Sequence, residues 1–224
     1  MIVYGKQIFF YIAQKHPDLI EEVYLAKEVD KKLFSKVNNL GKKIIKLDKM
    51  KAQSLARGGN HQGFLLKIKY IEYADIKELK KEDFLLVLVG LTDVGNIGAI
   101  IRSAYALGVK GVVISGTKIH LEGIVRSSVG TLLDMPVALF SDTATLLNEL
   151  KQLGFTSYAA DMDGEDVRDM TFEGKKVLLM GSEGTGLPNR IIKACDKKIK
   201  IAMDNAFDSL NVSAAAAILC DRMR

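Results

Sequence analysis

A continuous apolar run at residues 85–89 constrains the fold of this chain more than any other stretch. A strand without polar alternation must be covered on both faces, which is typical of a parallel sheet in an α/β protein. The run leads into the loop GLTDVGNIG at residues 90–98, and the residues that follow predict a helix over 99–107 that stops before Gly108. Strand, glycine-containing loop and helix, in this order, form ligand-binding sites in open α/β sheets.

The loop lacks the two common nucleotide-binding patterns. GNIG does not have the GxGxxG spacing of a dinucleotide site, and the chain contains no GxxxxGK[ST] phosphate loop. A nicotinamide- or ATP-dependent enzyme is therefore disfavoured.

Further segments extend the α/β prediction along the chain. Beyond residue 84, apolar runs and helical spacing predict strands and one more helix, at 111–115, 137–140, 155–160 and 177–180 for the strands and 143–153 for the helix. The acidic segment 161–169 lacks the alternating ligand pattern of a calcium loop, so we expect an exposed loop there. This part of the chain is predicted to form a mostly parallel sheet.

The residues before 70 predict a smaller α/β sandwich. Helical and strand patterns alternate there, with helices expected over 3–15 and 31–38 and strands over 22–26, 43–47 and 64–68. The polar segment 70–83 has few core residues and is predicted to be a linker. The expected organisation is thus a domain over 1–69, a linker over 70–83 and a second domain over 84–224.

The positive charge is concentrated in the first part of the chain. Residues 1–83 contain 17 Lys/Arg against 11 Asp/Glu, whereas residues 84–224 contain 15 against 16. Residues 31–69 hold 11 basic residues and one acid, Asp48. Such a stretch indicates either a surface that meets phosphates or a solvated, lysine-rich face. The glycine-rich loop 57–63 lies within it, and its His61 could contact RNA or orient the loop.

Composition excludes other classes of protein. No apolar run approaches the ~18 residues of a membrane span, and the start of the chain lacks a signal-peptide pattern, so we expect a cytoplasmic protein with no membrane partner. Two cysteines, Cys195 and Cys220, and three histidines provide neither a disulfide framework nor a zinc site. Both cysteines are predicted to be buried apolar residues, and no metal is expected.

Three loops carry polar residues that could do chemistry. Ser209, Leu210 and Asn211 begin an alanine-rich helix, where the two polar side chains either cap the helix or bind a polar ligand. Arg102 lies six residues after Asn96 in a largely apolar helix and must either emerge to solvent or face a polar cavity. The loop 181–188 holds three glycines and one charge, Glu183, and forms either a structural turn or the wall of a flat ligand site.

Together these loops resemble a known family. NIGAIIRSAYALGV, VLLMGSEGTGLP, and IAM followed by SLNVSAAAAI are similar to the three motifs of the SpoU/TrmH family of RNA ribose 2′-O-methyltransferases, in the SPOUT superfamily. The resemblance implies a C-terminal α/β knot, a deep trefoil knot with a mostly parallel sheet. The first part, from YGKQ to NHQGFLLKI, resembles an L30e-like α/β substrate-binding domain. That extension is typical of the subgroup that methylates a guanosine of large-subunit (23S) ribosomal RNA.

The resemblance also implies roles for individual residues. S-adenosylmethionine would be the methyl donor, held by Gly181, Ile201, Met203 and Leu210. Arg102 would be the catalytic residue, and a second set would orient it, the ribose and the cofactor: Asn96, Glu183, Ser209 and Asn211. Three residues of the glycine-rich loop are implied to touch RNA: Arg57, Asn60 and His61. A homodimer is expected as well.

Two positions depart from the family pattern, and two alternatives remain open. Ala202 replaces a proline of the third motif, and Arg126 stands where lysine is more frequent. A tRNA ribose methyltransferase of the same superfamily, or a non-catalytic RNA-binding protein that keeps the fold, would share most of these features. Loss of S-adenosylmethionine binding would favour the second alternative.

Overall fold

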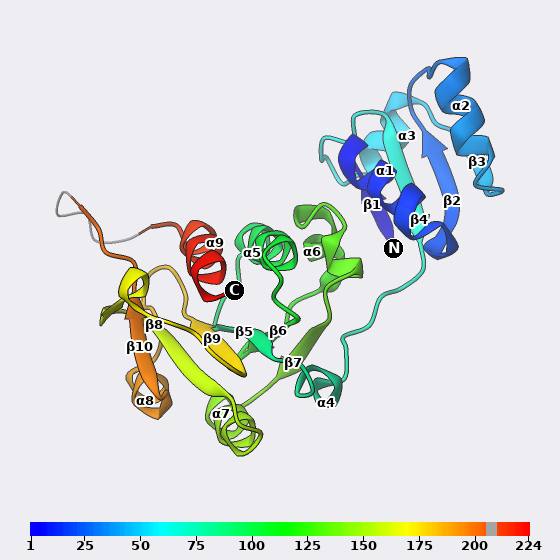
Figure 1. Ribbon diagram of the computed structural model, residues 1–224. Coiled ribbons are helices and arrows are strands. Elements are labelled where there is room, and N and C mark those ends of the chain that lie inside the picture. The colour runs from blue at the N-terminus through cyan, green and yellow to red at the C-terminus, as the bar shows by residue number, and fades with distance from the viewer. Residues whose placement is uncertain (205–209) are drawn as a thin grey trace.

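The computed structural model describes residues 1–204 and 210–224, which form two sheets with helices around them (Figure 1). The first part of the chain consists of β1 (Ile2–Tyr4), α1 (Lys6–Lys15), η1 (Pro17–Leu19), β2 (Ile20–Leu25), α2 (Lys31–Asn38), β3 (Lys43–Lys46), α3 (Lys49–Leu55), β4 (Phe64–Ile68) and α4 (Ile76–Leu79). The second part begins with β5 (Phe84–Val89), α5 (Val94–Ala106), β6 (Gly111–Ser115), α6 (Leu121–Ser127), η2 (Thr131–Leu133) and β7 (Val137–Phe140). It continues with α7 (Thr143–Gln152), β8 (Thr156–Asp166), η3 (Val167–Asp169), β9 (Lys176–Met180), α8 (Asn189–Ala194), β10 (Lys197–Lys200) and α9 (Val212–Met223).

The N-terminal sheet has the strand order β1-β4-β2-β3. β2 and β3 run parallel, while β4 is antiparallel to both β1 and β2. Helix α1 buries Ile8, Phe9 and Ile12, and the ring of Phe9 lies 5.0 Å from that of Phe64 on β4. Because strands and helices bury their apolar faces against each other, α1 packs on this sheet, and the buried residues of the two elements belong to the same apolar cluster as those beneath α5.

Two expectations for this region differ from the structure, and one helix was not expected. The helix expected from residue 3 begins at Lys6, because Ile2–Tyr4 pairs with β4 and Gly5 turns the chain with a φ of 114°. Helix α3 was not expected; its polar sequence buries only Ala52, and the Asp48 carboxylate caps it by accepting from the Lys51 N–H at 2.8 Å. Helix α4 interrupts the predicted linker and buries Leu79.

The second sheet is parallel throughout, with the order β10-β8-β9-β5-β6-β7. Helices α5, α6 and α9 cover one face and α4, α7 and α8 the other (Figure 1). In β5, Leu86 and Leu88 join the core beneath α5, whereas Leu85 and Val87 join the core beneath α7. The continuous apolar run predicted from the sequence is therefore a strand buried on both faces.

In the second part of the chain, the end of one strand and the start of one helix differ from the sequence-based expectation. Strand β8 continues to Asp166 through the segment expected to be a loop, and Glu165 pairs with Ile199 of β10. A side chain at Gly164 would approach the Ile199 backbone to 2.5 Å, so the two strands meet closely there. Helix α5 begins at Val94 rather than at residue 99, because the Asp93 carboxylate caps it.

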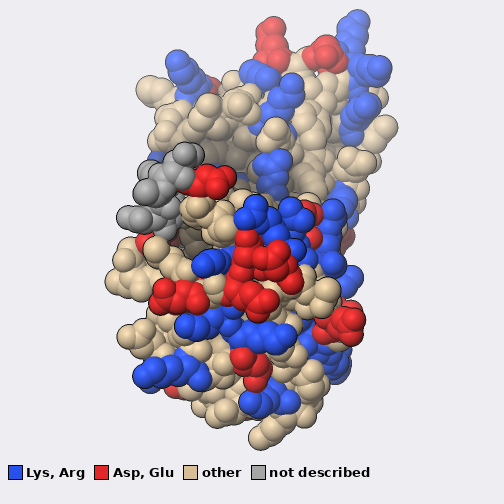
Figure 2. Space-filling model, turned by 60° about the vertical axis from the view of Figure 1, so that its left-hand side comes forward, with Lys and Arg blue, Asp and Glu red and all other residues tan. Residues whose placement is uncertain are grey.

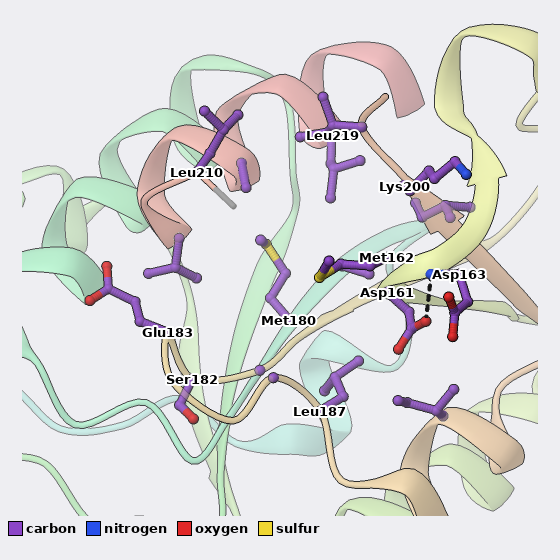
Figure 3. Close-up of a pocket in the computed structure, with 18 of the residues that line it drawn as sticks. Asp161, Met162, Asp163, Met180, Ser182, Glu183, Leu187, Lys200, Leu210 and Leu219 are labelled. Atoms are coloured by element: carbon purple, nitrogen blue, oxygen red, sulfur yellow. Dashed lines mark hydrogen bonds between the residues drawn. The ribbon is translucent and has the colours of Figure 1, made fainter. Parts of the chain in front are cut away.

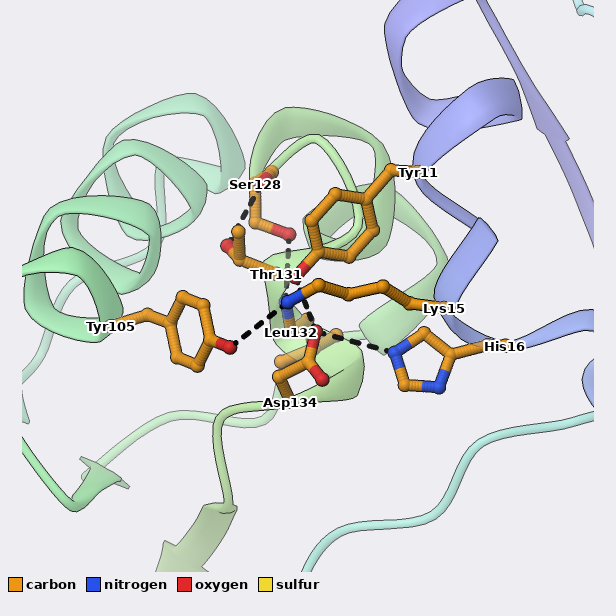
Figure 4. A network of polar contacts seen from close by, with 8 residues as sticks. All are labelled: Tyr11, Lys15, His16, Tyr105, Ser128, Thr131, Leu132 and Asp134. Atoms are coloured by element: carbon orange, nitrogen blue, oxygen red, sulfur yellow. Dashed lines mark hydrogen bonds and ion pairs between the residues drawn. The ribbon is translucent and has the colours of Figure 1, made fainter. Parts of the chain in front are cut away.

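The two parts of the chain meet where α1 contacts Asp134, directly after η2, and Tyr105 on α5. The Tyr11 hydroxyl donates to the Asp134 carboxylate, and His16 Nε2 lies 3.2 Å from the same carboxylate (Figure 4). Lys15 Nζ donates to the hydroxyl of Tyr105 on α5 at 3.2 Å. Burial and the hydrogen bond to Asp134 raise the pKa of Tyr11, so its hydroxyl stays protonated at neutral pH.

A second contact joins Tyr4 at the end of β1 to Arg126 on α6. The guanidinium lies 4.8 Å from the centre of the tyrosine ring and donates to its hydroxyl. Arg126, one of the two departures from the family pattern, thus packs on the N-terminal part of the molecule. A planar guanidinium suits this stacked position better than a lysine ammonium.

No helix within the described residues is long and apolar enough to cross a bilayer.

Candidate active site

A pocket of about 920 Å³ opens where β9 ends (Figure 3). Its walls come from the ends of β8 and β9, the loop after β9, the segment after β10 and one face of α9. Figure 3 shows Met162, Met180 and Leu187 facing the cavity, with Leu210 and Leu219 above them. Ligands of parallel α/β sheets bind at the carboxyl ends of strands, which is where this pocket lies.

The loop after β9 folds back on itself. The Gly186 N–H donates to the Ser182 carbonyl at 2.9 Å, and Gly186 has a φ of 62°. A Cβ at Gly181 would lie 2.0 Å from the carbonyl carbon of Gly186. The loop's own backbone therefore requires glycine at position 181.

Beside this loop, three side chains form a triangle of hydrogen bonds. The Asn96 amide donates to Glu183 Oε1 at 3.0 Å, and the Asn211 amide donates to the same oxygen at 2.6 Å. Asn211 also donates to Asn96 Oδ1 at 3.1 Å. Asn96 lies in the first turn of α5, Glu183 in the loop after β9 and Asn211 at the start of α9. The triangle therefore brings together residues from each of the three motifs.

Asn211 has two structural duties. Its side-chain oxygen accepts from the Ser213 N–H at 2.9 Å, which caps α9, while its amide group faces Glu183. The helix cap raised by the sequence thus holds for Asn211, and binding of a polar ligand stays a prediction. Ser209, the other residue expected at this position, lies outside the described residues.

Arg102 is exposed on α5, six residues after Asn96. Within the described part of the chain it makes no side-chain hydrogen bond or ion pair, so the triangle does not include it. The sequence left two possibilities for Arg102, exposure to solvent or a place in a polar cavity. In the structure its side chain is exposed to solvent.

The four residues expected to hold the cofactor all line the pocket: Gly181, Ile201, Met203 and Leu210. Sequence reasoning missed the contribution of β8, because Asp161 and Asp163 were assigned to an exposed loop. The Asp163 N–H donates to Asp161 Oδ1 at 2.9 Å, and both carboxylates border the cavity (Figure 3). It also missed Val212, Ala215 and Leu219, although their helical spacing places them on one face of α9.

The residues expected to contact RNA lie in the loop between α3 and β4, in the N-terminal part of the molecule (Figure 1). Arg57 and Asn60 are exposed, whereas His61 is partly buried and its Nδ1 accepts from the Gly63 N–H at 3.0 Å. That bond orients the loop. A side chain at Gly59 would collide with the Tyr4 hydroxyl at 2.0 Å, so the loop packs against the tyrosine that Arg126 holds.

Neither cysteine is arranged for chemistry. Burial raises the pKa of the Cys220 thiol to about 12, and burial together with the charge of Asp196 does the same for Cys195. Both thiols are therefore protonated at neutral pH. No group of three or more potential metal ligands gathers anywhere in residues 1–204 and 210–224.

The surface beside the pocket is not uniformly basic. Figure 2 shows Asp and Glu gathered in the middle of one face of the molecule, with Lys and Arg on either side. The charge balance of the sequence agrees, because residues 84–224 carry 15 basic and 16 acidic residues. The excess of positive charge belongs to the N-terminal part.

The pocket at the edge of the parallel sheet, walled by a folded-back loop and a small-residue helix, lies where the resemblance to the SpoU/TrmH methyltransferases implies the methyl donor. The comparisons agree: residues 83–221 match the model of the SpoU rRNA Methylase family, and residues 2–74 match that of the RNA 2′-O ribose methyltransferase substrate-binding domain. The chain belongs to the SpoU rRNA methylase family. It is therefore an enzyme, an S-adenosylmethionine-dependent RNA methyltransferase, and the non-catalytic alternative is set aside.

Two relatives are 30% and 35% identical in sequence to this chain over the aligned residues. An uncharacterized tRNA/rRNA methyltransferase of Archaeoglobus fulgidus is 35% identical over 162 residues, which cover 69% of this chain and 72% of the relative. A 23S rRNA (guanosine-2′-O-)-methyltransferase RlmB of Vibrio vulnificus is 30% identical over 231 residues, which cover 96% and 93%.

Solved structures confirm the fold. The SpoU methyltransferase AviRb from Streptomyces viridochromogenes, in complex with AdoMet, superposes with a TM-score of 0.80 at 23% identity, covering 100% of this chain and 88% of that one. An AdoMet-bound rRNA methyltransferase from Sinorhizobium meliloti gives 0.75 at 22% identity, with 100% and 86% covered. The two-part α/β fold expected from the sequence, with a parallel C-terminal sheet, is thus confirmed.

Proposed function

We propose that this enzyme transfers a methyl group from S-adenosylmethionine to the ribose 2′-hydroxyl of a guanosine in large-subunit (23S) ribosomal RNA. One observation carries the proposal: Glu183 borders the pocket and also accepts hydrogen bonds from Asn96 and Asn211. The methyl donor's pocket and the polar groups that meet the ribose therefore share a wall.

The pocket suits the methyl donor in volume and in lining. Met180, Leu187 and Leu219 offer apolar surface for an adenine, and the carboxylates of Asp161 and Asp163 suit positively charged groups. When bound, S-adenosylmethionine supplies an electrophilic methyl group on a positively charged sulfur. The ribose oxygen bonds to the methyl carbon while the carbon–sulfur bond breaks, S-adenosylhomocysteine leaves and the hydroxyl proton is released.

The residues of this chain are proposed to orient the ribose and to stabilise the charge that develops on its oxygen. Arg102 is assigned to the ribose, where its guanidinium stabilises the developing alkoxide. A guanidinium is too basic to accept the hydroxyl proton as a general base, so a phosphate of the substrate is the proposed acceptor. Asn96, Glu183, Asn211 and the undescribed Ser209 are assigned to orient Arg102 and the ribose.

Ribosomal RNA is favoured over tRNA because of the N-terminal part. The RlmB relative of Vibrio vulnificus aligns over 96% of this chain, so the similarity includes the substrate-binding part. We assign RNA contact to residues 1–69, with Arg57, Asn60 and His61 at the surface, and methyl transfer to residues 84–224. The cytoplasmic location expected from the sequence stays a prediction.

We also propose that the enzyme works as a homodimer. Ile218 on α9 is 38% exposed in the monomer, and Ala214 of the same helix is exposed. Small and apolar residues on one helix allow close packing against a second copy. Light scattering should give twice the mass of one chain; a mass near 24.7 kDa would contradict the dimer.

The test of the function is transfer of radiolabelled methyl to separated ribosomal and transfer RNA that lack the modification. Label in one alkali-resistant dinucleotide of large-subunit RNA is the expected result, because a 2′-O-methyl group blocks alkaline cleavage at that nucleotide. Label only in tRNA would retain the chemistry and reject the substrate. Label in neither, on free RNA or on ribosomal particles, would reject the proposal.

A further inference from the structure

We propose that a second pocket, in the N-terminal part of the molecule, binds an unpaired nucleobase of the RNA substrate away from the nucleotide that is methylated. The pocket has a volume of about 450 Å³ and lies between the end of β2, helix α2 and the end of β3. That the ligand is RNA rests on the proposed function; that the pocket takes a base rests on its own residues.

An exposed aromatic ring stands at this pocket. Phe34 on α2 is 40% exposed, although the same helix buries Val37, and Leu25 and Leu47 add apolar surface to the lining. Bases of single-stranded RNA stack on such rings, since every base has a flat π-face. The pocket thus offers a stacking platform beside an apolar wall.

The charges around the pocket favour a polyanion. Lys27 and Lys46 are exposed and belong to the lining, against one acid, Glu28. The N-terminus of α2 is not free to bind a phosphate. The Asp30 carboxylate already caps it and accepts from the Leu33 N–H at 2.7 Å. Phosphates would therefore pair with the lysines at the rim, which leaves the apolar interior for a base.

The pocket is continuous with the loop already assigned to RNA. The Ala26 N–H donates to the Gly63 carbonyl at 2.9 Å, and a side chain at Gly63 would come within 2.5 Å of the Lys27 side chain. Lys27 Nζ lies 4.4 Å from the centre of the Phe64 ring, at the start of β4. A strand of RNA that touches Arg57 and Asn60 can thus continue into the pocket.

The chain contains no tryptophan, so a Phe34→Trp variant carries a lone fluorophore at the pocket. We expect saturable quenching of its fluorescence by a short single-stranded oligoadenylate, since a stacked base quenches the indole. An abasic oligonucleotide of equal length, with the same phosphates, should not quench it. Met50→Trp is the matched control: Met50 lies on α3, is 82% exposed and does not line the pocket.

A kinetic test uses the full RNA substrate. Phe34→Ala should raise KM for RNA roughly tenfold while kcat and cofactor binding stay unchanged, because base–aromatic stacking contributes to binding. Met50→Ala should leave both constants unchanged, and a thermal melt should show that each variant is folded.

The two hypotheses fail separately. Absence of quenching in Phe34→Trp, equal quenching by the abasic oligonucleotide, or wild-type KM in Phe34→Ala would overturn the base pocket while methyl transfer by the wild type stood. Absence of methyl transfer by the wild type would reject the proposed function, and the oligoadenylate titration would still decide whether the pocket binds a base.

Discussion

At the scale of single residues, one carboxylate oxygen organises the site. Glu183 Oε1 accepts from two amide groups, those of Asn96 and Asn211, and the two asparagines also bond each other. These side-chain hydrogen bonds therefore link three segments that lie far apart in sequence. Arg102 lies outside this set, and its side chain is exposed.

We expect Arg102→Ala to bind S-adenosylmethionine like the wild type but to lower turnover by about 10²- to 10³-fold, the usual effect of removing a group that stabilises a developing oxyanion. Calorimetry of cofactor binding and single-turnover methyl transfer separate the two effects. Arg102→Lys keeps the charge without the planar donor set and should recover only part of the rate. Wild-type turnover in Arg102→Ala would remove this residue from the mechanism.

Asn211→Asp separates the two duties of Asn211. Aspartate caps helices as well as asparagine does, so we expect unchanged thermal stability. The new carboxylate would face that of Glu183, which is now 2.6 Å from the amide nitrogen, and repulsion should open the triangle. Methyl transfer should fall about tenfold or more, whereas equal activity in wild type and variant would show that the triangle is dispensable.

The residue scale also shows what sequence could provide. Asn96, Glu183 and Asn211 were predicted as a set from their motifs, and the structure brings them together. The reason for Gly181 could not be predicted, because it depends on a contact with Gly186 that exists only when the loop is folded. Likewise, no sequence pattern states in which direction Arg102 leaves its helix.

At the scale of elements, the loop after β9 is the most constrained part of the site. It returns on itself between Ser182 and Gly186, and its glycine at 181 leaves no room for a side chain. It supplies Glu183 to the triangle and Leu187 to the core beneath α7. Its shape therefore links the pocket to the stability of the sheet.

Gly181→Ala should abolish cofactor binding and lower the thermal midpoint, because the added methyl group would lie 2.0 Å from backbone that cannot move cheaply. Gly184→Ala is the matched control in the same loop, since a Cβ there meets nothing within 4 Å. Calorimetric titration with S-adenosylmethionine and a thermal melt measure both effects. Wild-type affinity in Gly181→Ala would show that the loop adapts.

The sequence predicted a strand well where all of its residues are buried. It predicted a strand less well where buried and exposed residues are mixed. Strand β5 was evident because every one of its residues is buried. Strand β8 was cut short because its last residues alternate acids with Met162 and Gly164, a pattern that resembles a loop. Strand β1 was assigned to the following helix, because only its partner β4 distinguishes it from a helical turn.

At the scale of the whole molecule, Asp134 joins the two parts of the chain. Burial alone would raise the pKa of its carboxyl, but the hydrogen bond from Tyr11 and the nearby His16 and Lys15 outweigh burial and lower it. The carboxylate therefore stabilises the folded arrangement above its ordinary pKa of about 3.9, and this stabilisation is lost as the pH falls through the lower, folded-state value.

We expect Asp134→Ala to lower the free energy of unfolding by about 1.5–3 kcal/mol at neutral pH, the usual worth of a hydrogen bond to a charged group. The difference from the wild type should shrink as the pH falls below about 4, because the carboxyl is protonated first in the unfolded chain and, at still lower pH, in the folded one. Urea unfolding at several pH values measures it. In a double-mutant cycle, Tyr11→Phe should be nearly silent once Asp134 is alanine; full additivity would contradict the coupling.

The order in which the pocket walls occur along the chain has a consequence for biosynthesis. The N-terminal sheet is complete at residue 68, but the pocket needs Leu219 of α9 as well as Asp161 of β8. Domains fold from the N-terminus as they leave the ribosome, so a nascent chain displays its RNA-binding part long before it can hold a methyl donor. If residues 1–69 bind RNA as proposed, a nascent copy would associate with RNA while still catalytically silent, and activity would begin only when α9 closes the pocket.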